Sequence, residues 1–274
     1  MSAFTIYHQC KEFIELQQPA WVNTIRQSAN PDMVFLLGAS RYRRRSESIF
    51  QYTAPSSMYI GDLFLLILIS DLGNKTLADW QDKIEVNCRH LGTGSVWVVA
   101  TTSFQEWLKQ GHSFAVQVWQ KAVRWFDNGT ITCVTAPAED LAAETEAIEK
   151  NRVAGKNRAK EFLVAAELFI ARKQFGMAAF MLHQCTEQTL ITLVKAQTGY
   201  YANTHSIDRL LRLAELVSYQ IRDRLPRNTE QQKSRFTLLQ KAYIEARYKP
   251  DFKVTESDIE YLLQVVKDVF ELLD

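Results

Sequence analysis

Residues 33–45 read MVFLLGASRYRRR, and this stretch decides how the first half of the chain is interpreted. Its first five residues are continuously apolar, which is typical of a buried strand. Gly38 follows at once and predicts a tight turn, and the four arginines after it predict a basic loop at residues 41–45. Such a turn lets a backbone approach a phosphate closely, and Arg41 could donate paired hydrogen bonds to it. A plain turn followed by a solvated charged loop fits the same residues.

Outward from this stretch, two more apolar runs predict buried strands, Leu63–Ile69 and Ser95–Ala100. Asp127-Asn128-Gly129 is expected to be a turn, with a last strand at Thr130–Val134. Helical spacing of apolar residues predicts helices over Phe4–Leu16, Trp21–Ser28, Lys75–His90 and Ser103–Gln110. Pro19 should separate the first two, because proline removes a helical hydrogen bond. Strands that alternate with helices predict a small mixed sheet covered by helices.

The chain changes character near residue 140. All six tryptophans come before that point, and the later residues show only helical periodicity. That periodicity predicts helices over Arg158–Gln174, Met177–Gln197, Ile207–Tyr219, Phe236–Arg247 and Glu256–Leu273. Thr255 precedes an acidic first turn and is the expected N-cap of the last one. We therefore expect an α+β protein with an α/β domain at residues 1–137, a linker or connecting helix at 138–155 and a helical bundle at 156–274.

Composition excludes several classes of protein. The 274 residues include 32 basic and 31 acidic side chains, so net charge does not indicate a nucleic-acid partner. The longest apolar run has far fewer than the roughly 18 residues that a membrane helix needs. The N-terminus does not read as a signal peptide. The four cysteines form no CxxC pair, which argues against a zinc site or a disulfide framework and favours a cytoplasmic location.

The segment YIGDLFLL, residues 59–66, places one carboxylate, Asp62, at the start of the second predicted strand. An acid there can hold magnesium, but two-metal phosphoryl transfer needs two carboxylates side by side. A lone aspartate at a strand start can equally be a turn residue.

Together with Gly38, this segment resembles the minimal nucleotidyltransferase domain over roughly residues 20–135. That family reads strand, Gly-Ser, loop, Ser-Asp-x-Asp, strand, with a third acid on a later strand. Gly38 matches the glycine and Asp62 the first acid, whereas Ala39 stands at the serine and Phe64 at the second acid. The third predicted strand contains no acid. The resemblance implies a degenerate site that could still hold a phosphate through Gly38, Ser40 and Arg41.

Three stretches of the second half occur in the order of the HEPN family: AAFMLHQCTE at residues 178–187, THSI at 204–207 and ARYKPDF at 246–252. Residues 156–272 thus resemble a HEPN domain, which implies an antiparallel helical bundle that commonly forms a homodimer. Some members are metal-independent ribonucleases that carry an arginine, four to six residues, then a histidine. No histidine of this chain stands at that distance after an arginine, so we expect no ribonuclease general base.

Gln184 and Glu187 share one side of the helix predicted at Met177–Gln197, and Arg247 and Tyr248 end a later helix. In a HEPN-like bundle these regions face each other, so we expect Glu187 to approach Arg247. One interpretation is a polar pocket for a phosphate or a base. The other is a buried ion pair that fixes the register of the helices.

Our interpretation is a cytoplasmic, self-associating HEPN-domain protein that binds a nucleotide or another phosphate ligand and carries a degenerate nucleotidyltransferase-like domain. The alternatives are an active nucleotidyltransferase with acids such as Asp71 or Glu47, a ribonuclease with non-standard residues, and a pure interaction module. We expect no catalytic residues, no resident metal and no cofactor. Magnesium would bind only under the enzyme alternative.

Overall fold

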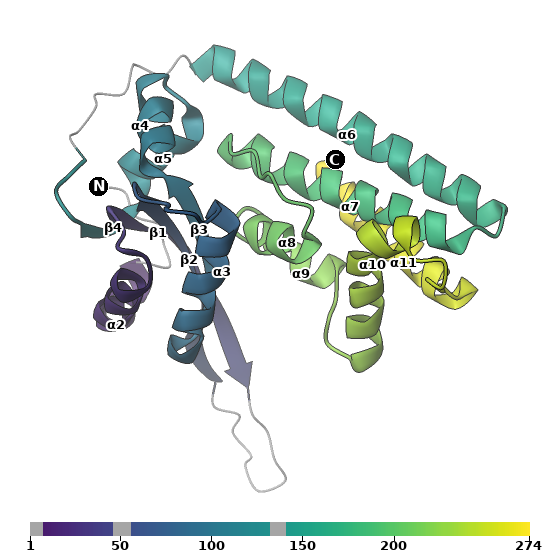
Figure 1. Cartoon of the computed structure of the whole chain (residues 1–274), viewed down its shortest axis with the longest axis horizontal. Coiled ribbons are helices and arrows are strands. Elements are labelled where there is room, and N and C mark those ends of the chain that lie inside the picture. Colours follow the sequence, from purple (N-terminus) through teal and green to yellow (C-terminus); the bar gives the residue numbers. More distant parts are fainter. Residues whose placement is uncertain (1–7, 46–55, 132–140) are drawn as a thin grey trace, which may run out of the picture. The chain divides into compact units, whose positions relative to one another are not determined.

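The computed structural model describes residues 8–45, 56–131 and 141–274. The chain divides into two compact units, Met1–Glu139 and Asp140–Asp274, which are described separately (Figure 1). The first is a mixed sheet with helices and the second is helical, so the predicted α+β class is confirmed. No helix in the described ranges is both long and apolar enough to cross a membrane.

The first unit is built on a four-stranded sheet with the order β3-β2-β1-β4. The strands are β1 (Met33–Arg45), β2 (Ser56–Ile69), β3 (Thr93–Ala100) and β4 (Val123–Asp127). β1 pairs antiparallel with both β2 and β4, while β2 pairs parallel with β3. Residues 41–45 of β1 extend past the other two strands and pair only with the start of β2, so this part of the sheet is a two-stranded ribbon.

Each face of this sheet is covered by a pair of helices. One pair is α2 (Lys11–Ala29) and α3 (Leu77–Cys88), and the other is α4 (Thr101–Lys109) and α5 (Ser113–Lys121). A short 3-10 turn, η1 (Arg89–Leu91), follows α3. Alternate strand residues such as Val34 and Leu65 pack with Trp21 of α2 in one core. Phe35 of β1 faces the other way, with its ring centroid 6.1 Å from that of Phe104 in α4. The sheet is therefore buried on both faces, as its continuous apolar runs predict.

Gly38 does not end the first strand, and the basic stretch after it is not a loop. β1 runs through Gly38 with register shifts on both sides of it, between Leu36 and Gly38 and between Ala39 and Arg41. These shifts are β-bulges, which bend a strand without ending it. Pairing with β2 gives the backbone of residues 41–45 its hydrogen bonds, so the strand continues into the arginines.

One further prediction about the first unit is wrong. Pro19 lies inside the continuous helix α2, because the face that carries the buried Trp21 and Ile25 stabilises the helix on both sides of it. A strand forms at Val123–Asp127, before the Asp127–Gly129 turn, while residues 132–134 of the strand predicted at Thr130–Val134 lie outside the described residues. The turn itself is confirmed: Gly129 donates its N–H to Asp127 Oδ1 at 2.8 Å. Residues 1–7 and 132–140, where other parts of these elements were expected, lie outside the described residues.

Asp32, just before β1, is a buried carboxylate that joins the ends of the other strands. It accepts hydrogen bonds from Ser70 after β2, from Thr101 after β3 and, at 3.0 Å, from Asn128 Nδ2 after β4. Burial alone would raise the pKa of Asp32, but these hydrogen bonds outweigh it and the pKa lies below its ordinary value. The carboxylate is thus held ionised by three connections of the sheet.

The second unit is a bundle around α7 (Phe175–Thr198), with fourteen buried residues on that one helix. Its other helices are α6 (Leu141–Ala171), α8 (Ile207–Glu215), α9 (Ile221–Arg224), α10 (Glu230–Tyr248) and α11 (Glu256–Phe270), followed by the 3-10 turn η2 (Glu271–Leu273). The predicted N-cap is confirmed, because Thr255 Oγ1 accepts the N–H of Asp258 at 3.2 Å. α6 is continuous, so residues 141–155 belong to the first helix of this unit.

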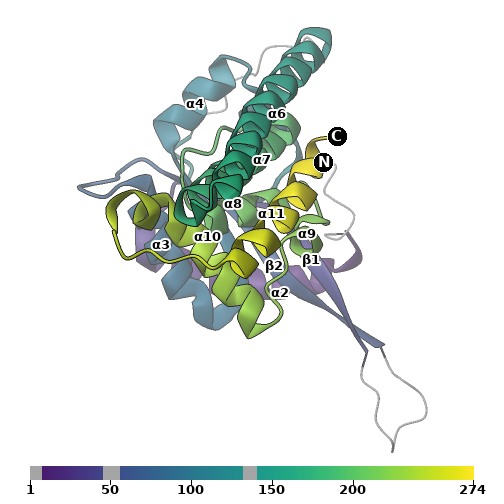
Figure 2. The ribbon, with the colours of Figure 1, turned by 90° about the vertical axis from the view of Figure 1, so that its right-hand side faces the viewer.

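α6 and α7 lie side by side (Figure 2), and they approach each other closely at Gly155. A Cβ atom built on Gly155 would lie 2.1 Å from Thr192 Oγ1 and 2.7 Å from its Cγ2. Thr192 is itself buried and has a β-branched, stiff side chain. The two helices can therefore approach this closely only because residue 155 has no side chain.

We expect Gly155→Ala to destabilise the protein. Overpacking costs about 1–3 kcal/mol, whereas the gain in helix propensity is at most about 1 kcal/mol. Thermal unfolding should show a lower Tm for this variant and an unchanged or higher Tm for Asn157→Ala, at an exposed position of the same helix. Adding Thr192→Ala should recover part of the loss. A Tm for Gly155→Ala equal to that of the wild type would contradict the close crossing.

Candidate functional site

In the first unit the structure brings Ser40 and Asp62 together across β1 and β2. Ser40 Oγ donates to Asp62 Oδ2 at 2.8 Å and accepts the Asp62 N–H at 2.9 Å. Asp62 is only 6% exposed. Burial raises the pKa of its carboxyl above the ordinary value, although the hydrogen bond from Ser40 acts in the opposite direction. Asp62 thus helps to hold the two strands together, and its predicted role in ligand binding stays a prediction.

Gly38 and Arg41, which were predicted for the same site, lie in β1 together with Ser40. Gly38 is buried and pairs with Phe64, while Arg41 is exposed and donates to Gln9 Oε1. Of the alternative acids, Asp71 accepts the N–H of Gly73 at 3.0 Å in the turn after β2. Glu47 lies outside the described residues. Phosphate binding at Gly38, Ser40 and Arg41 stays a prediction.

Phe64 stands where a second metal-binding acid would be needed. Its side chain is 4% exposed, and its neighbour on β3 is Ser95. A carboxylate at this position would be buried among apolar side chains, which costs several kcal/mol. Within the described ranges, no three His, Cys, Asp or Glu side chains gather as metal ligands would.

The helical unit contains a buried carboxylate with two histidines around it. Glu187 of α7 is 3% exposed. His205, from the loop before α8, places Nδ1 3.0 Å from Glu187 Oε2. His183, one turn earlier on α7, is fully buried and places Nε2 3.5 Å from the same oxygen. Its Nδ1 lies 3.0 Å from the carbonyl oxygen of Leu239, which requires a proton on Nδ1.

The ring of Tyr243, in α10, contacts both of these histidines. Its ring stacks on His205, with centroids 4.5 Å apart and planes 17° apart, and on His183 at 5.2 Å and 27°. The guanidinium carbon of Arg247 lies 4.4 Å from the Tyr243 centroid. We refer to His183, Glu187, His205, Tyr243 and Arg247 as the histidine–tyrosine cluster.

The expected ion pair between Glu187 and Arg247 is not formed. Both histidines lie within 3.5 Å of Glu187 Oε2, whereas no ion pair joins Arg247 to this carboxylate and the guanidinium lies against the Tyr243 ring. In the part of the chain that the structure describes, the one hydrogen bond that Arg247 makes runs from Nε to the Tyr243 carbonyl oxygen, at 2.7 Å. The contacts between elements here come from the histidines: His205 links the loop before α8 to α7, and His183 links α7 to α10 through the Leu239 carbonyl oxygen.

The remaining predicted residues surround this cluster. Tyr248 is 71% exposed, and its ring centroid lies 5.0 Å from the Arg247 guanidinium carbon. Gln188 Nε2 lies 3.5 Å from Glu187 Oε1. Nε2 of Gln184 is buried with no hydrogen-bond partner among the described residues. Cys185 is packed in the core, where burial raises the pKa of its thiol to about 12, so it is no nucleophile at neutral pH.

The charge of the cluster follows from its hydrogen bonds. Burial alone would raise the pKa of Glu187, but the interactions with His183 and His205 outweigh it and lower the pKa below the ordinary 4.5. Glu187 is therefore ionised at neutral pH and orients both imidazoles. The side chain of His205 remains 57% exposed, and its Nε2 has no bond to any described residue. An exposed imidazole with a fixed Nδ1 can exchange a proton with a ligand through Nε2.

Glu187→Gln should lower the free energy of unfolding at about pH 7 by about 1–3 kcal/mol, because the imidazole of His205 loses its charged acceptor. The folded pKa lies below 4.5, so the carboxylate stabilises the fold above that pH and this stabilisation is lost as the pH falls through the folded pKa. Urea unfolding between about pH 7 and pH 3 should thus show a shallower pH dependence for Glu187→Gln than for the wild type. Glu161→Gln, at an exposed position of α6, is the matched control. Equal pH profiles for wild type and Glu187→Gln would contradict the assigned role.

Comparison with known proteins identifies the second unit. Residues 155–274 match the family model of the HEPN domain. No curated protein matches the chain in a sequence comparison. The match begins at Gly155, where α6 approaches Thr192 of α7 closely, and includes the whole histidine–tyrosine cluster. The predicted HEPN domain is therefore confirmed, and the helical unit of this chain carries it.

Proposed function

We propose that the HEPN domain binds a nucleotide or another phosphate ligand at the histidine–tyrosine cluster. The main support for this proposal is the set of contacts that the Arg247 guanidinium makes. Its guanidinium lies against aromatic rings, 4.4 Å from the Tyr243 centroid and 5.2 Å from that of Phe180, and among the described residues it has no carboxylate partner. A guanidinium that is held by stacking and has unpaired N–H groups is suited to bidentate binding of a phosphate.

The groups beside Arg247 suit the rest of a nucleotide. The largely exposed ring of Tyr248 offers a surface on which a base can stack, and such stacking is worth about 1–3 kcal/mol. His205 is oriented by Glu187 and stacks on the ring of Tyr243. Because Arg247 contacts the same ring, Nε2 of His205 belongs to the same proposed site. A ligand with both a phosphate and a planar group would contact all three side chains.

For the first unit we propose a nucleotidyltransferase-like fold whose catalytic site is degenerate. The support is the pairing of its single acid, Asp62, with Ser40, and the burial of Phe64 at the position of the second acid. A two-metal mechanism needs a second carboxylate beside Asp62. This proposal predicts that ligand binding by the chain does not depend on magnesium.

Arg247→Gln should remove ligand binding with little loss of stability, because Arg247 is exposed and makes no ion pair with any described residue. Adenosine 5′-monophosphate at about ten times its Kd should raise the Tm of the wild type by about 5 °C and that of the variant by much less. The shift should be the same with EDTA as with magnesium. Arg158→Gln, at an exposed position of α6, is the control. No shift for the wild type, or the same shift for Arg247→Gln, would refute the site.

A second candidate function is metal-independent cleavage of RNA. The chain lacks the arginine–histidine spacing of the ribonuclease members, but folding places the exposed His205 and Arg247 on one Tyr243 ring. His205 Nε2 could take the proton of a 2′-hydroxyl as the 2′-oxygen attacks phosphorus. The 5′-oxygen would leave with a proton from water, giving a 2′,3′-cyclic phosphate. Arg247 would neutralise the charge that builds up on the phosphate.

This candidate predicts cleavage of a single-stranded oligoribonucleotide in EDTA and none of the matching oligodeoxyribonucleotide, which has no 2′-hydroxyl. His205→Ala should lower the rate by about 100-fold or more. His90→Ala, in the first unit, should leave the rate unchanged. Nucleotide binding without RNA cleavage would leave the binding proposal standing and remove this one.

We also propose that the protein is cytoplasmic and self-associates through its helical unit. The support for self-association is a set of exposed apolar side chains on α6, namely Val153, Val164 and Leu168, which are 45%, 51% and 58% exposed. The support for the location is that the described cysteines, Cys10, Cys88 and Cys185, are all free thiols. Sedimentation should show a dimer that Leu168→Glu converts to a monomer, whereas a monomeric wild type would contradict self-association.

A further inference from the structure

The arginine-rich end of β1 forms a two-stranded ribbon with the start of β2. Residues 41–45 of β1 pair with residues 56–60 of β2. In the described part of the sheet, β4 pairs with β1 only at residues 33–36, and β3 pairs with β2 only from Asp62 onward. Figures 1 and 2 both show the paired strands continuing past the rest of this sheet. We refer to residues 41–45 and 56–60 as the β-ribbon.

The register of the β-ribbon places three arginines on one of its faces. Pairing with β2 is regular from residue 41 to residue 45. Alternate residues of a strand share a face, so Arg41, Arg43 and Arg45 lie on one face, spaced about 6.7 Å apart along the strand. Arg44 lies on the other face. The fold therefore arranges the basic stretch as a row of positively charged positions, which a loop would not do.

The β-ribbon has no negative charge of its own. Its ten residues read RYRRR and SSMYI, with four arginines and no acid, and no other five consecutive residues of the chain include four basic side chains. The single acid of the two strands is Asp62, whose carboxyl is buried and accepts a hydrogen bond from Ser40. Arg41 is exposed and donates to the neutral side chain of Gln9. A local cluster of this kind attracts polyanions even where the net charge of a chain is close to zero.

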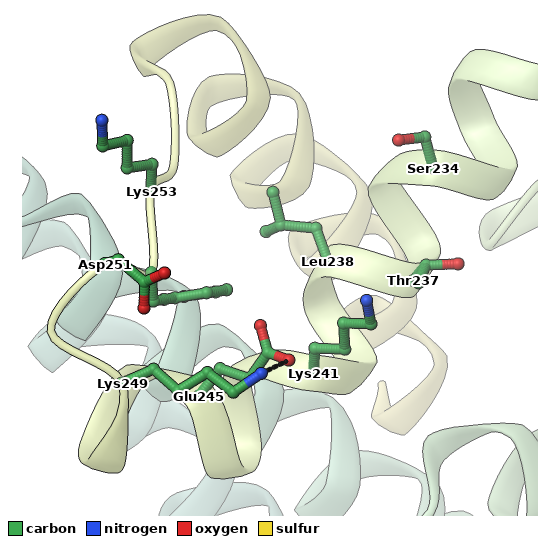
Figure 3. Close-up of a pocket in the computed structure, with 9 residues that line it drawn as sticks. Ser234, Thr237, Leu238, Lys241, Glu245, Lys249, Asp251 and Lys253 are labelled. Carbon is green, nitrogen blue, oxygen red and sulfur yellow. Dashed lines mark hydrogen bonds and ion pairs between the residues drawn. The ribbon is translucent and has the colours of Figure 1, made fainter.

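A groove along α10 in the helical unit shows a different arrangement of charge. It is lined by α10 and by residues 249–253, and it combines three lysines with two acids: Lys241, Lys249, Lys253, Glu245 and Asp251 (Figure 3). Lys249 Nζ lies 2.7 Å from Glu245 Oε1. Charges of both signs on one helix face are typical of a solvated surface. The β-ribbon differs because all of its charges have one sign.

We propose that the β-ribbon binds duplex DNA, with its arginines on the phosphate backbone at the major groove. Strands of a sheet lie about 4.8 Å apart, and the major groove of B-DNA, about 12 Å wide, admits a two-stranded ribbon. Guanidinium groups bind phosphate through paired hydrogen bonds. Contacts of this kind do not depend on base sequence, so the proposed binding is non-specific. It is separate from the phosphate site proposed at Arg247, which belongs to the other unit.

Two other nucleic acids fit the β-ribbon less well. The major groove of an RNA duplex is deep and narrow, which prevents entry of a ribbon. Proteins that bind single strands stack the bases on aromatic side chains. The face that carries three arginines also carries Ser56, Met58 and Ile60 from β2, and none of these residues is aromatic. The register thus favours a duplex over a single strand.

The test is fluorescence anisotropy of a labelled DNA duplex of about 20 base pairs, titrated with the full chain. We expect a Kd of about 1–100 µM at about 150 mM salt, and a slope of about −3 for log K against log salt concentration, because three to four phosphates are neutralised. The triple variant Arg43→Gln, Arg44→Gln, Arg45→Gln should bind at least about tenfold more weakly, with a slope of about −1. Arg43→Gln and Arg45→Gln alone should each make the slope shallower by about 1, so the test does not depend on the triple variant.

The matched control removes three exposed lysines of the groove in Figure 3. Lys241→Gln, Lys249→Gln, Lys253→Gln lowers the net charge by the same amount as the triple arginine variant, and it should bind the duplex as the wild type does. Adenosine 5′-monophosphate, the probe for the site at Arg247, should not displace the duplex. The lysine variant Arg43→Lys, Arg44→Lys, Arg45→Lys should keep the salt slope of the wild type, because counterion release depends on charge.

Four outcomes would overturn the proposal. The first is no binding of the duplex at about 200 µM protein and 50 mM salt. The second is wild-type affinity and salt slope in both single arginine variants and in the triple variant. The third is equal loss in the lysine control or displacement by poly-glutamate, either of which would indicate general charge attraction. The fourth is tighter binding of an RNA duplex or a single strand of the same length, or displacement by adenosine 5′-monophosphate.

Discussion

A carboxylate buried inside a helical bundle must have hydrogen-bond partners, and the helical unit depends on how Glu187 meets this requirement. Its hydrogen-bond partner is His205, which the loop before α8 has to deliver, and His183, one turn earlier on α7, places Nε2 3.5 Å from the same oxygen. Both imidazoles stack on the ring of Tyr243 in α10. One buried charge thus ties a helix, a loop and a second helix into a single arrangement. Arg247 is exposed beside that arrangement because the carboxylate is already satisfied.

The sequence predicts most of this fold, for a physical reason. Buried strands and amphipathic helices leave clear periodicities, so all three apolar runs lie in strands and every helix expected beyond residue 155 exists. The errors arise where burial outweighs a local signal. Pro19 stays helical because its neighbours pack on the sheet, and Gly38 stays in a strand because bulges absorb it.

The site is less predictable than the fold. Glu187, Arg247 and Tyr248 do gather in one region, as expected, but the links between them are His205 and Tyr243, which are far apart in sequence. The one usable signal was the spacing of Tyr243 and Arg247, four residues apart on one helix face. A motif defined by spacing could not show that His205 shares a ring with Arg247, because the tertiary fold alone brings them together. Asp62 shows the opposite case, since its sequence position suggests a metal ligand while Ser40 gives it a structural role.

The hydrogen bonds of Asp32 limit where the first unit could bind a ligand. β2, β3 and β4 run in one direction, so their carboxyl ends lie at one edge of the sheet, the edge at which open α/β sheets hold their ligands. Here Ser70, Thr101 and Asn128, the residues directly after those strands, all turn inward to the Asp32 carboxylate. Asp32 occupies the place of a bound anion, as an internal substitute that the chain carries covalently. An external anion at this edge would have to compete with a tethered one that never diffuses away.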